Sequence, residues 1–274
     1  MHYNGGRDIQ ETVMHPMLNI AVRAARAAGN IIIRQIDYVR DLPVNEKSRN
    51  DFVTVVDRQA EEIIIETIHK AYPAHAFLAE ESGPRGDNDY IWIIDPLDGT
   101  TNYLHGFPQY AVSIALQHKG VLRQAVIYDP LRDELFTAGH GHGAYLNDRR
   151  MRVSKQKQLH GSLLGTGFPF REGARMDQYL ETLKVFFAVT AGVRRAGAAA
   201  LDLAYVACGR LDGFWESGLK PWDMAAGILL IEEAGGLVGD FKGGDSYLAS
   251  GAIVAGNPAV YKEMIESFSK LKLE

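Results

Sequence analysis

The stretch that most constrains this chain is residues 91–102, which reads Ile-Trp-Ile-Ile-Asp-Pro-Leu-Asp-Gly-Thr-Thr-Asn. Its first four residues form an apolar run that predicts a buried strand. Pro96 cannot continue a regular strand ladder because it has no amide hydrogen. Two carboxylates, Asp95 and Asp98, therefore stand at the end of a buried strand. That placement is costly unless a positive charge lies beside them.

The residues that follow these carboxylates are suited to a phosphate. Backbone amides of a Gly99-Thr100-Thr101 turn that opens a helix can bind one, and glycine lets the backbone come close to a ligand. Hard cations such as magnesium take oxygen ligands, usually carboxylates together with phosphate oxygens. Residues 91–102 thus indicate a metal-assisted phosphate site. For a lone Asp-x-x-Asp-Gly pattern the alternative is a strand followed by an Asx-type turn.

Length and composition narrow the class of protein. The 274 residues, 46% hydrophobic and 23% charged, suffice for one large domain or two closely packed halves. A net charge of −5 gives no global basic footprint for nucleic acid. A single cysteine, Cys208, permits no internal disulfide, and no apolar run approaches the ~20 residues of a membrane span. We therefore expect a cytoplasmic protein that does not enter a membrane.

Periodicity and turn residues predict the order of elements. We expect residues 1–13 to be a disordered or extraneous leader, 14–150 to form an N-terminal antiparallel-sheet half, and 151–274 a C-terminal α/β half of one compact unit. Polar loops are expected over 37–49 and 83–89. Helices are predicted over 17–36, from Asp57 to before Pro73, over 179–188, 199–209 and about 221–234, and after Pro258; strands are predicted over 75–79, 91–94, 111–117, 122–128, 134–138, 211–216, near 237 and over 252–255.

Residues 92–102 resemble the metal-binding signature of the inositol monophosphatase family, whose members hydrolyse phosphate monoesters with magnesium and are typically inhibited by lithium. Glu80-Glu81-Ser82 and the stretch 222–227 are similar to two further motifs of that family, in the same order. The resemblance runs from about Met17 to Phe268 and is greatest to bacterial members. It implies an α+β fold, a layered α/β/α/β/α sandwich of the sugar phosphatase type with an antiparallel-sheet half and a mixed α/β half.

The resemblance also implies roles for single residues. Three of them would be catalytic, five would hold two or three Mg²⁺ ions through side chains or a backbone carbonyl, and others would contact substrate. The catalytic residues are Glu80, Thr100 and Asp57; the metal ligands are Glu80, Asp95, the Leu97 carbonyl, Asp98 and Asp223; the substrate contacts are Asp98, Gly99, Thr100, Gly197, Ala198, Ala199 and Glu216, with Lys47 as a secondary residue.

Ordinary structural roles compete with several of these assignments. Asp57 and Asp223 also fit first-turn acids of helices, and Lys47 fits a solvated loop lysine. Glu80 and Glu81 should point to opposite faces of an extended segment, so only one can reach the site. Ala198 departs modestly from the family pattern, which affects substrate preference rather than chemistry.

The implied activity is hydrolysis of a phosphorylated polyol, most simply inositol 1-phosphate to inositol and phosphate, by a homodimer. The same site could serve fructose 1,6-bisphosphate or a nucleotide 3′-phosphate. An alternative of another class is a non-catalytic partner of the bacterial transcription machinery that does not itself contact nucleic acid. A purely structural metal protein is disfavoured because the ligands leave positions open for phosphate.

Overall fold

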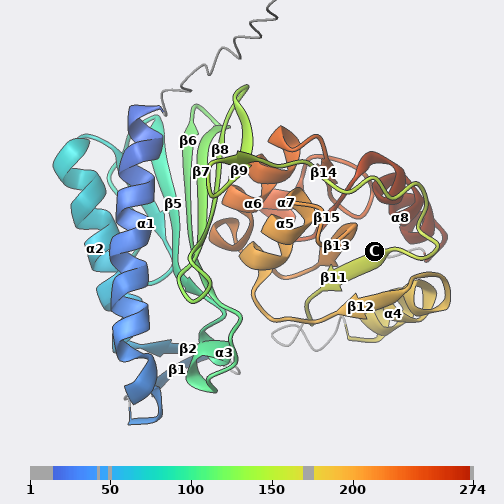
Figure 1. Cartoon of the computed structure of the whole chain (residues 1–274), viewed down its shortest axis with the longest axis horizontal. Helices are drawn as coiled ribbons and strands as arrows, with labels where there is room; N and C mark the ends of the chain where they lie inside the picture. Colours follow the sequence, from blue (N-terminus) through green and yellow to red (C-terminus); the bar gives the residue numbers. More distant parts are fainter. Residues whose placement is uncertain (1–14, 42–43, 49–50, 169–175, 272–274) are drawn as a thin grey trace, which may run out of the picture.

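The computed structural model describes residues 15–41, 44–48, 51–168 and 176–271, with the backbone alone at 40–41, 44–48 and 51–52. These residues form the expected layered sandwich of helices and sheets (Figure 1). The leader predicted over 1–13 lies outside them. From one side to the other the layers are α1 (Pro16–Gln35) with α2 (Val55–Ala71), an eight-stranded sheet, α5 (Ala199–Ala207) with α6 (Pro221–Glu233), a five-stranded sheet, and α4 (Met176–Val189) with α8 (Pro258–Leu271).

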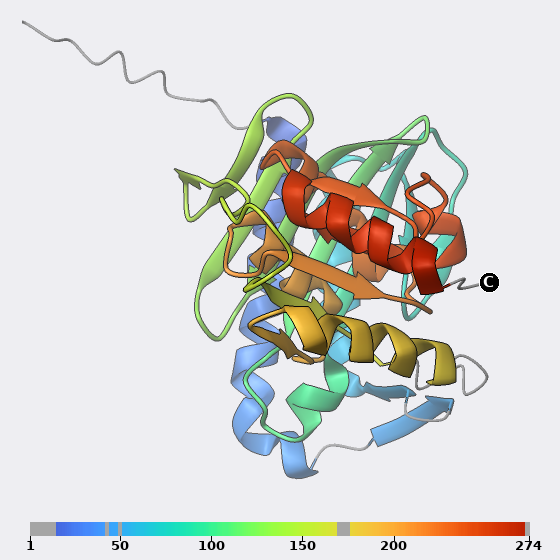
Figure 2. The same ribbon diagram turned by 90° about the vertical axis from the view of Figure 1, so that its right-hand side faces the viewer.

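The eight-stranded sheet is antiparallel except for the pair β3 and β5, which run parallel. The five-stranded sheet is mixed, and α4 and α8 lie on its outer face (Figure 2). In spatial order the first sheet is β10 (Arg149–Arg150), β9 (Gly143–Leu146), β8 (Glu134–Gly139), β7 (Val121–Asp129), β6 (Ala111–His118), β5 (Tyr90–Asp98), β3 (Ala76–Ala79) and β4 (Gly83–Arg85); the second is β12 (Gly192–Arg194), β11 (Leu163–Thr166), β13 (Gly213–Glu216), β15 (Ile253–Gly256) and β14 (Leu237–Gly239).

Some elements differ from the sequence expectations. The loop expected over 37–49 contains η1 (Ile36–Asp41) and β1 (Val44–Ser48), which pairs with β2 (Asp51–Thr54). The loop expected over 83–89 begins with β4. The remaining elements are two short helices, α3 (Thr100–Leu104) and α7 (Tyr247–Ser250). The sequences of β1 and β4 carry no apolar alternation, so the strand signal was missing there, and the structure shows each of them paired with a neighbouring strand.

Both faces of the eight-stranded sheet are covered, so its strands read as continuous apolar runs. Along β5, Trp92 and Ile94 are buried on the side of α1 and α2, whereas Ile93 is buried on the side of α5 and α6. The second face carries small side chains where those helices pack: Ala111, Ala115, Ala125, Ala138 and Ala144. The same hydrophobic cluster includes Phe214 and Ile253 of the five-stranded sheet, so one core joins the two halves. No helix in the described ranges is long and apolar enough to cross a membrane.

Helices α5 and α6 pack closely against each other inside this core. A Cβ atom added to Gly227 of α6 would lie 2.5 Å from the Leu203 Cβ of α5. Both residues belong to buried helix faces. The glycine that ends the 222–227 stretch is therefore required by helix packing.

We expect Gly227→Ala to destabilise the protein by about 1–3 kcal/mol, because overpacking forces neighbouring side chains and backbone to shift. The direction of this change in unfolding free energy is informative. At an exposed helix position, replacing glycine by alanine instead stabilises a protein by about 1 kcal/mol, because alanine has the higher helix propensity. Urea unfolding followed by circular dichroism measures the difference. A variant as stable as the wild type would contradict the close packing of α5 against α6.

Candidate active site at the junction of the two halves

Two of the predicted carboxylates are brought together by the parallel pair of strands. Ala79 of β3 pairs with Ile94 of β5, so Glu80, the first residue after β3, lies beside Asp95, which is still within β5 and pairs with Ser113 of β6. The Glu80 amide donates to the Ile94 carbonyl at 3.1 Å, which fixes this register beyond the end of β3. Asp95 is 2% exposed. A buried carboxylate of β5 thus lies beside a second one that directly follows the end of β3.

β5 continues beyond Pro96, contrary to the strand end expected at Ile94, but its pairing with β6 shifts register between Asp95 and Asp98. Within this irregularity the Leu97 amide donates to Asp95 Oδ1 at 3.0 Å, so the Asx-type turn is present as well. The shift directs Asp98 towards the other half of the molecule, where its Oδ2 accepts the Ala200 amide at 2.7 Å.

Asp223 approaches from α6. Its Oδ2 accepts the Lys220 amide at 2.7 Å, as a first-turn acid does. The preceding carbonyl, that of Trp222, accepts a hydrogen bond from Ser113 Oγ at 3.2 Å. Ser113 is paired with Asp95 across β5 and β6, so this bond holds the start of α6 over the end of β5. The helix-capping and site-forming roles of Asp223 coexist.

These carboxylates interact strongly. Burial raises the pKa of Asp95 well above its usual range, and the charges of Glu80, Asp98 and Asp223 raise it further. Burial likewise raises the pKa of Asp98, with Asp223 as the leading charged neighbour. Among the described residues, no three His, Cys, Asp or Glu side chains already enclose a cation position. The set is nevertheless made of hard oxygen donors whose repulsion a divalent cation would relieve, which fits Mg²⁺.

Thr100 and Asp57 form a hydrogen-bonded pair beside this cluster. Asp57 Oδ2 accepts the amide and the hydroxyl of Thr54 at 2.8 and 2.6 Å, which closes a capping box at the start of α2. Its other oxygen, Oδ1, accepts the Thr100 hydroxyl at 3.0 Å. The Leu97 carbonyl lies at 3.0 Å from the same hydroxyl, whose single hydrogen serves one acceptor at a time. Burial raises the pKa of Asp57, and the hydrogen bonds from Thr54 and Thr100 oppose this.

Gly99 makes the turn between β5 and α3, with Thr100 as the first residue of α3. Its φ of +89° is the left-handed conformation that glycine adopts readily. A Cβ there would also lie 2.7 Å from the Gln109 carbonyl oxygen. The turn expected to bind phosphate therefore requires glycine for both its conformation and its close contacts.

The residues expected to contact the rest of the substrate lie on the opposite half. Gly197 and Ala198 lead into α5, Ala199 begins it, and Glu216 ends β13. Burial raises the pKa of Glu216 well above its usual range, followed by the charges of Asp202, Asp223 and others. That interaction places Glu216 within electrostatic reach of the carboxylate cluster. Lys47 falls on β1, and its side chain lies outside the described part of the chain.

Sequence reasoning missed residues that support the site. Glu61 of α2 is 3% exposed, and its carboxylate accepts the amides of Glu81 and Ser82 at 2.8 and 2.9 Å. It thereby holds the turn that carries Glu80. Its only signal was an acid on the apolar face of a helix, between Ala60 and Ile64. Asp202, 2% exposed on α5, and Gly167, against which the Glu216 carboxylate packs, gave no such signal.

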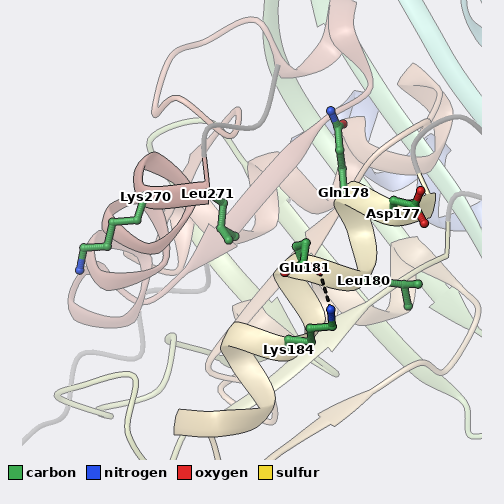
Figure 3. A pocket seen from close by; sticks show the side chains of 7 residues that line it. All are labelled: Asp177, Gln178, Leu180, Glu181, Lys184, Lys270 and Leu271. Atoms are coloured by element: carbon green, nitrogen blue, oxygen red, sulfur yellow. Dashed lines mark hydrogen bonds and ion pairs between the residues drawn. The ribbon is translucent and has the colours of Figure 1, made fainter.

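A separate groove of ≈ 490 Å³ lies between α4 and α8 (Figure 3). It carries none of the residues described above, and one ion pair, Lys184 to Glu181 at 2.5 Å, crosses its floor on a single helix. Its lining residues are Asp177, Gln178, Leu180, Glu181, Lys184, Lys270 and Leu271. The groove and the carboxylate cluster are therefore different places on the molecule.

This combination of fold and site has close counterparts among known proteins. A sequence model of the Inositol monophosphatase family matches residues 13–273. The chain therefore belongs to the inositol monophosphatase family, as the motif resemblance predicted. Membership supports a phosphatase activity, and the family generally depends on metal.

Individual relatives cover nearly the whole chain. The Nus factor SuhB of Pseudomonas aeruginosa is 56% identical over 258 residues, covering 92% of this chain and 95% of the relative. The Nus factor SuhB of Escherichia coli is 54% identical over 254 residues, covering 92% and 95%. The crystal structure of the extragenic suppressor protein suhB from Bartonella henselae has a TM-score of 0.91 at 46% identity, covering 93% and 99%. The structure of inositol monophosphatase from Anabaena has a TM-score of 0.83 at 42% identity, covering 93% and 95%.

The carboxylate cluster predicts how stability responds to Asp95→Asn. The raised pKa of Asp95 means that the folded state binds its proton more tightly, so stability is lost as the pH rises from the unfolded value of 3.8 through the higher folded value. At neutral pH the variant should therefore be at least as stable as the wild type in EDTA. With Mg²⁺ at about 100 times its dissociation constant, the wild type should gain about 2.7 kcal/mol and the variant far less.

Thermal unfolding in EDTA and in Mg²⁺ measures both effects. Asp89→Asn serves as the control, because Asp89 is an exposed acid that pairs with Lys119 at 3.7 Å and precedes the opposite end of β5 from Asp95. It should respond to Mg²⁺ as the wild type does. An equal gain for Asp95→Asn and the wild type would remove Asp95 from the metal site.

Proposed function

We propose that this chain is a magnesium-dependent phosphate monoester hydrolase whose main substrate is inositol 1-phosphate. The observation that carries the proposal is the junction of Glu80, Asp95, Asp98 and Asp223 beside the Thr100–Asp57 pair, where burial and the neighbouring carboxylates raise the pKa of Asp95 and of Asp98. Such a cluster lowers the stability of the folded protein unless bound cations offset the repulsion between its carboxylates. The cluster lies next to the turn at Gly99 that opens a helix, where backbone amides are available to bind a phosphate.

The proposed reaction gives the residues of the cluster and of the Thr100–Asp57 pair different roles. Glu80, Asp95, the Leu97 carbonyl, Asp98 and Asp223 hold two or three Mg²⁺ ions. When bound, Mg²⁺ acidifies water, orients the phosphate and stabilises the leaving alkoxide. Asp57 accepts the Thr100 hydroxyl hydrogen, which leaves a hydroxyl lone pair to take a hydrogen from the attacking water, with Glu80 beside it as the second group that orients this water.

The alcohol part of the substrate is assigned to the C-terminal half. Gly197, Ala198 and Ala199 are small residues that admit a ring, and Glu216 is the polar group that bonds its hydroxyls. The phosphate itself is bound by the amides of Gly99 and Thr100. The relative from Anabaena that carries the name inositol monophosphatase supports this choice over fructose 1,6-bisphosphate and nucleotide 3′-phosphates.

The experiment that tests the activity is phosphate release from inositol 1-phosphate with and without Mg²⁺, run beside fructose 1,6-bisphosphate and a nucleotide 3′-phosphate. We expect release that requires Mg²⁺ and is greatest with inositol 1-phosphate. Inhibition by lithium is part of the same expectation. No release from any of the three substrates would overturn the proposal.

The two threonines of the turn should behave differently. Thr100 is partly buried and bonded to Asp57, whereas Thr101 is exposed. Thr100→Ala should lower kcat by about 10²–10⁴, the usual range for a positioned general acid–base contact. Its KM should change little, because the backbone amide at residue 100 remains.

Thr101→Ala is the matched control, since it removes the same atoms one position away. It should stay near the wild type in kcat and within about 0.5 kcal/mol in stability, as surface changes usually do. Steady-state kinetics at saturating Mg²⁺ compares the two. The proposed water geometry is wrong if Thr101→Ala is the impaired variant.

We further propose that the chain forms a homodimer and has a second role as a partner of the bacterial transcription machinery. The observation favouring the second role is that relatives 56% and 54% identical to this chain carry the name Nus factor. The carboxylate cluster lies inside the junction of the two halves, so a surface partner need not touch it. The two roles are therefore separable by mutation.

Asp95→Asn should lose hydrolysis and still retain transcription complexes. The measurement is the amount of RNA polymerase from purified elongation complexes that is held by immobilised wild-type or variant chain, with blank resin as the background. Equal retention by the two chains is expected. Retention at background by the wild type would refute the second role, and loss only in the variant would tie it to the metal site.

A further inference from the structure

Asn102, the last residue of the 91–102 stretch, connects the two halves directly. Its side-chain Nδ2 donates to the Gln109 carbonyl at 2.8 Å, to the Ala196 carbonyl at 2.9 Å and to the Gly197 carbonyl at 3.2 Å. The first acceptor belongs to the same half, and the other two lie 94 and 95 residues further along the chain. Neither the proposed metal set nor the Thr100–Asp57 pair includes this amide.

The bonds of Asn102 attach one end of a short segment whose other end is held by Asp98. Asn102 binds the carbonyls of Ala196 and Gly197, and Asp98 Oδ2 accepts the Ala200 amide at 2.7 Å. The residues between these attachments are those assigned to the alcohol part of the substrate. Both anchors come from the 91–102 stretch, so this stretch sets the distance between the alcohol-binding segment and the carboxylates.

The segment packs tightly against its neighbours at Gly197. Its φ is +87°, and a Cβ there would lie 3.1 Å from Asn102 Nδ2 and 2.5 Å from an Arg195 guanidinium nitrogen. The backbone of Gly197 therefore lies directly against the Asn102 amide. A Cβ at Gly99 would lie 3.2 Å from the Ala198 Cβ, so the turn at Gly99 also contacts residues 196–200.

We propose that Asn102 is a positioning residue that sets specificity for the alcohol part of the substrate. It does so by fixing residues 196–200 against the turn at Gly99 and Thr100. This rests on the proposed hydrolase function. It separates two properties of the site: the carboxylates and the glycine turn bind metal and phosphate, and Asn102 governs only how a polyol fits beside them. The substrate class it selects is a phosphomonoester whose alcohol carries further hydroxyls.

The chemistry of the side chain dictates the informative variants. Asparagine presents two N–H donors from one short arm, and three carbonyl oxygens converge on them. Asn102→Ala removes the donors. Asn102→Asp keeps the size but turns an acceptor towards the carbonyls, so it should be at least as harmful, whereas a residue acting through packing alone would tolerate it.

Kinetics supply the first readout. Losing two or three hydrogen bonds should lower kcat/KM for inositol 1-phosphate about ten-fold or more, mainly through KM. The inhibition constant of inorganic phosphate, which has no alcohol part, should stay within about two-fold. A purely structural role would move both values together.

The control is Asn257→Ala. Asn257 also makes three side-chain hydrogen bonds, accepting the amides of Ala259 and Val260 and donating to Ser154 Oγ at 2.8 Å. Asn257 is 2% exposed and caps the start of α8. It follows the end of β15 that pairs with Gly213, which is the end away from Glu216. Its loss should lower stability without changing kcat/KM for inositol 1-phosphate.

Hydrogen–deuterium exchange supplies a readout that does not depend on activity. Peptides covering 196–200 should exchange faster in Asn102→Ala than in the wild type, and unchanged exchange there would overturn the proposal. Equal losses of phosphate binding and kcat/KM, or a wild-type value for Asn102→Asp, would overturn it as well. If the wild type releases no phosphate from any ester, the hydrolase proposal fails and the specificity role of Asn102 fails with it, while faster exchange would still establish the attachment.

Discussion

The structure depends on placing several carboxylates close together around the buried Asp95. Glu80 follows the end of β3 beside Asp95 of the parallel strand β5, and Asp98 and Asp223 approach within reach of their charges. Burial and mutual repulsion both disfavour the ionised forms. The surrounding fold must therefore hold these side chains against their repulsion. It does so through hydrogen bonds from the backbone, such as those from Leu97 to Asp95 and from Ala200 to Asp98.

The same constraint explains why the halves share one core. The cluster needs groups from both, and any sliding between the sheets would separate them. Small residues on β6, β7 and β8 let α5 and α6 pack closely against the eight-stranded sheet, and those helices also contact the five-stranded sheet. Ser113 and Asn102 then add polar bonds across the junction. Packing sets the spacing of the layers, and the polar bonds set their register.

Several polar residues combine a structural contact with a place in the proposed site. Asp57 caps α2 through one oxygen and holds Thr100 through the other. Asp223 accepts the Lys220 amide as a first-turn acid and also faces the cluster. Helix capping by these residues is therefore compatible with the roles proposed for them. Capping fixes the rotamer of each carboxylate, and a fixed rotamer is what a metal site or a water-positioning pair needs.

Local patterns in the amino-acid sequence were sufficient to predict several elements of this protein. The apolar spacing of 17–36 predicted α1, the buried runs predicted β5 to β8, and the motif residues indicated where carboxylates and glycine would meet, because burial and turn chemistry act over a few residues. The tertiary structure alone decided β4, the support of Glu80 by Glu61, the packing of Glu216 against Gly167, and the partners of Asn102. Those depend on contacts between segments up to 95 residues apart, for which a single sequence carries no periodic signal.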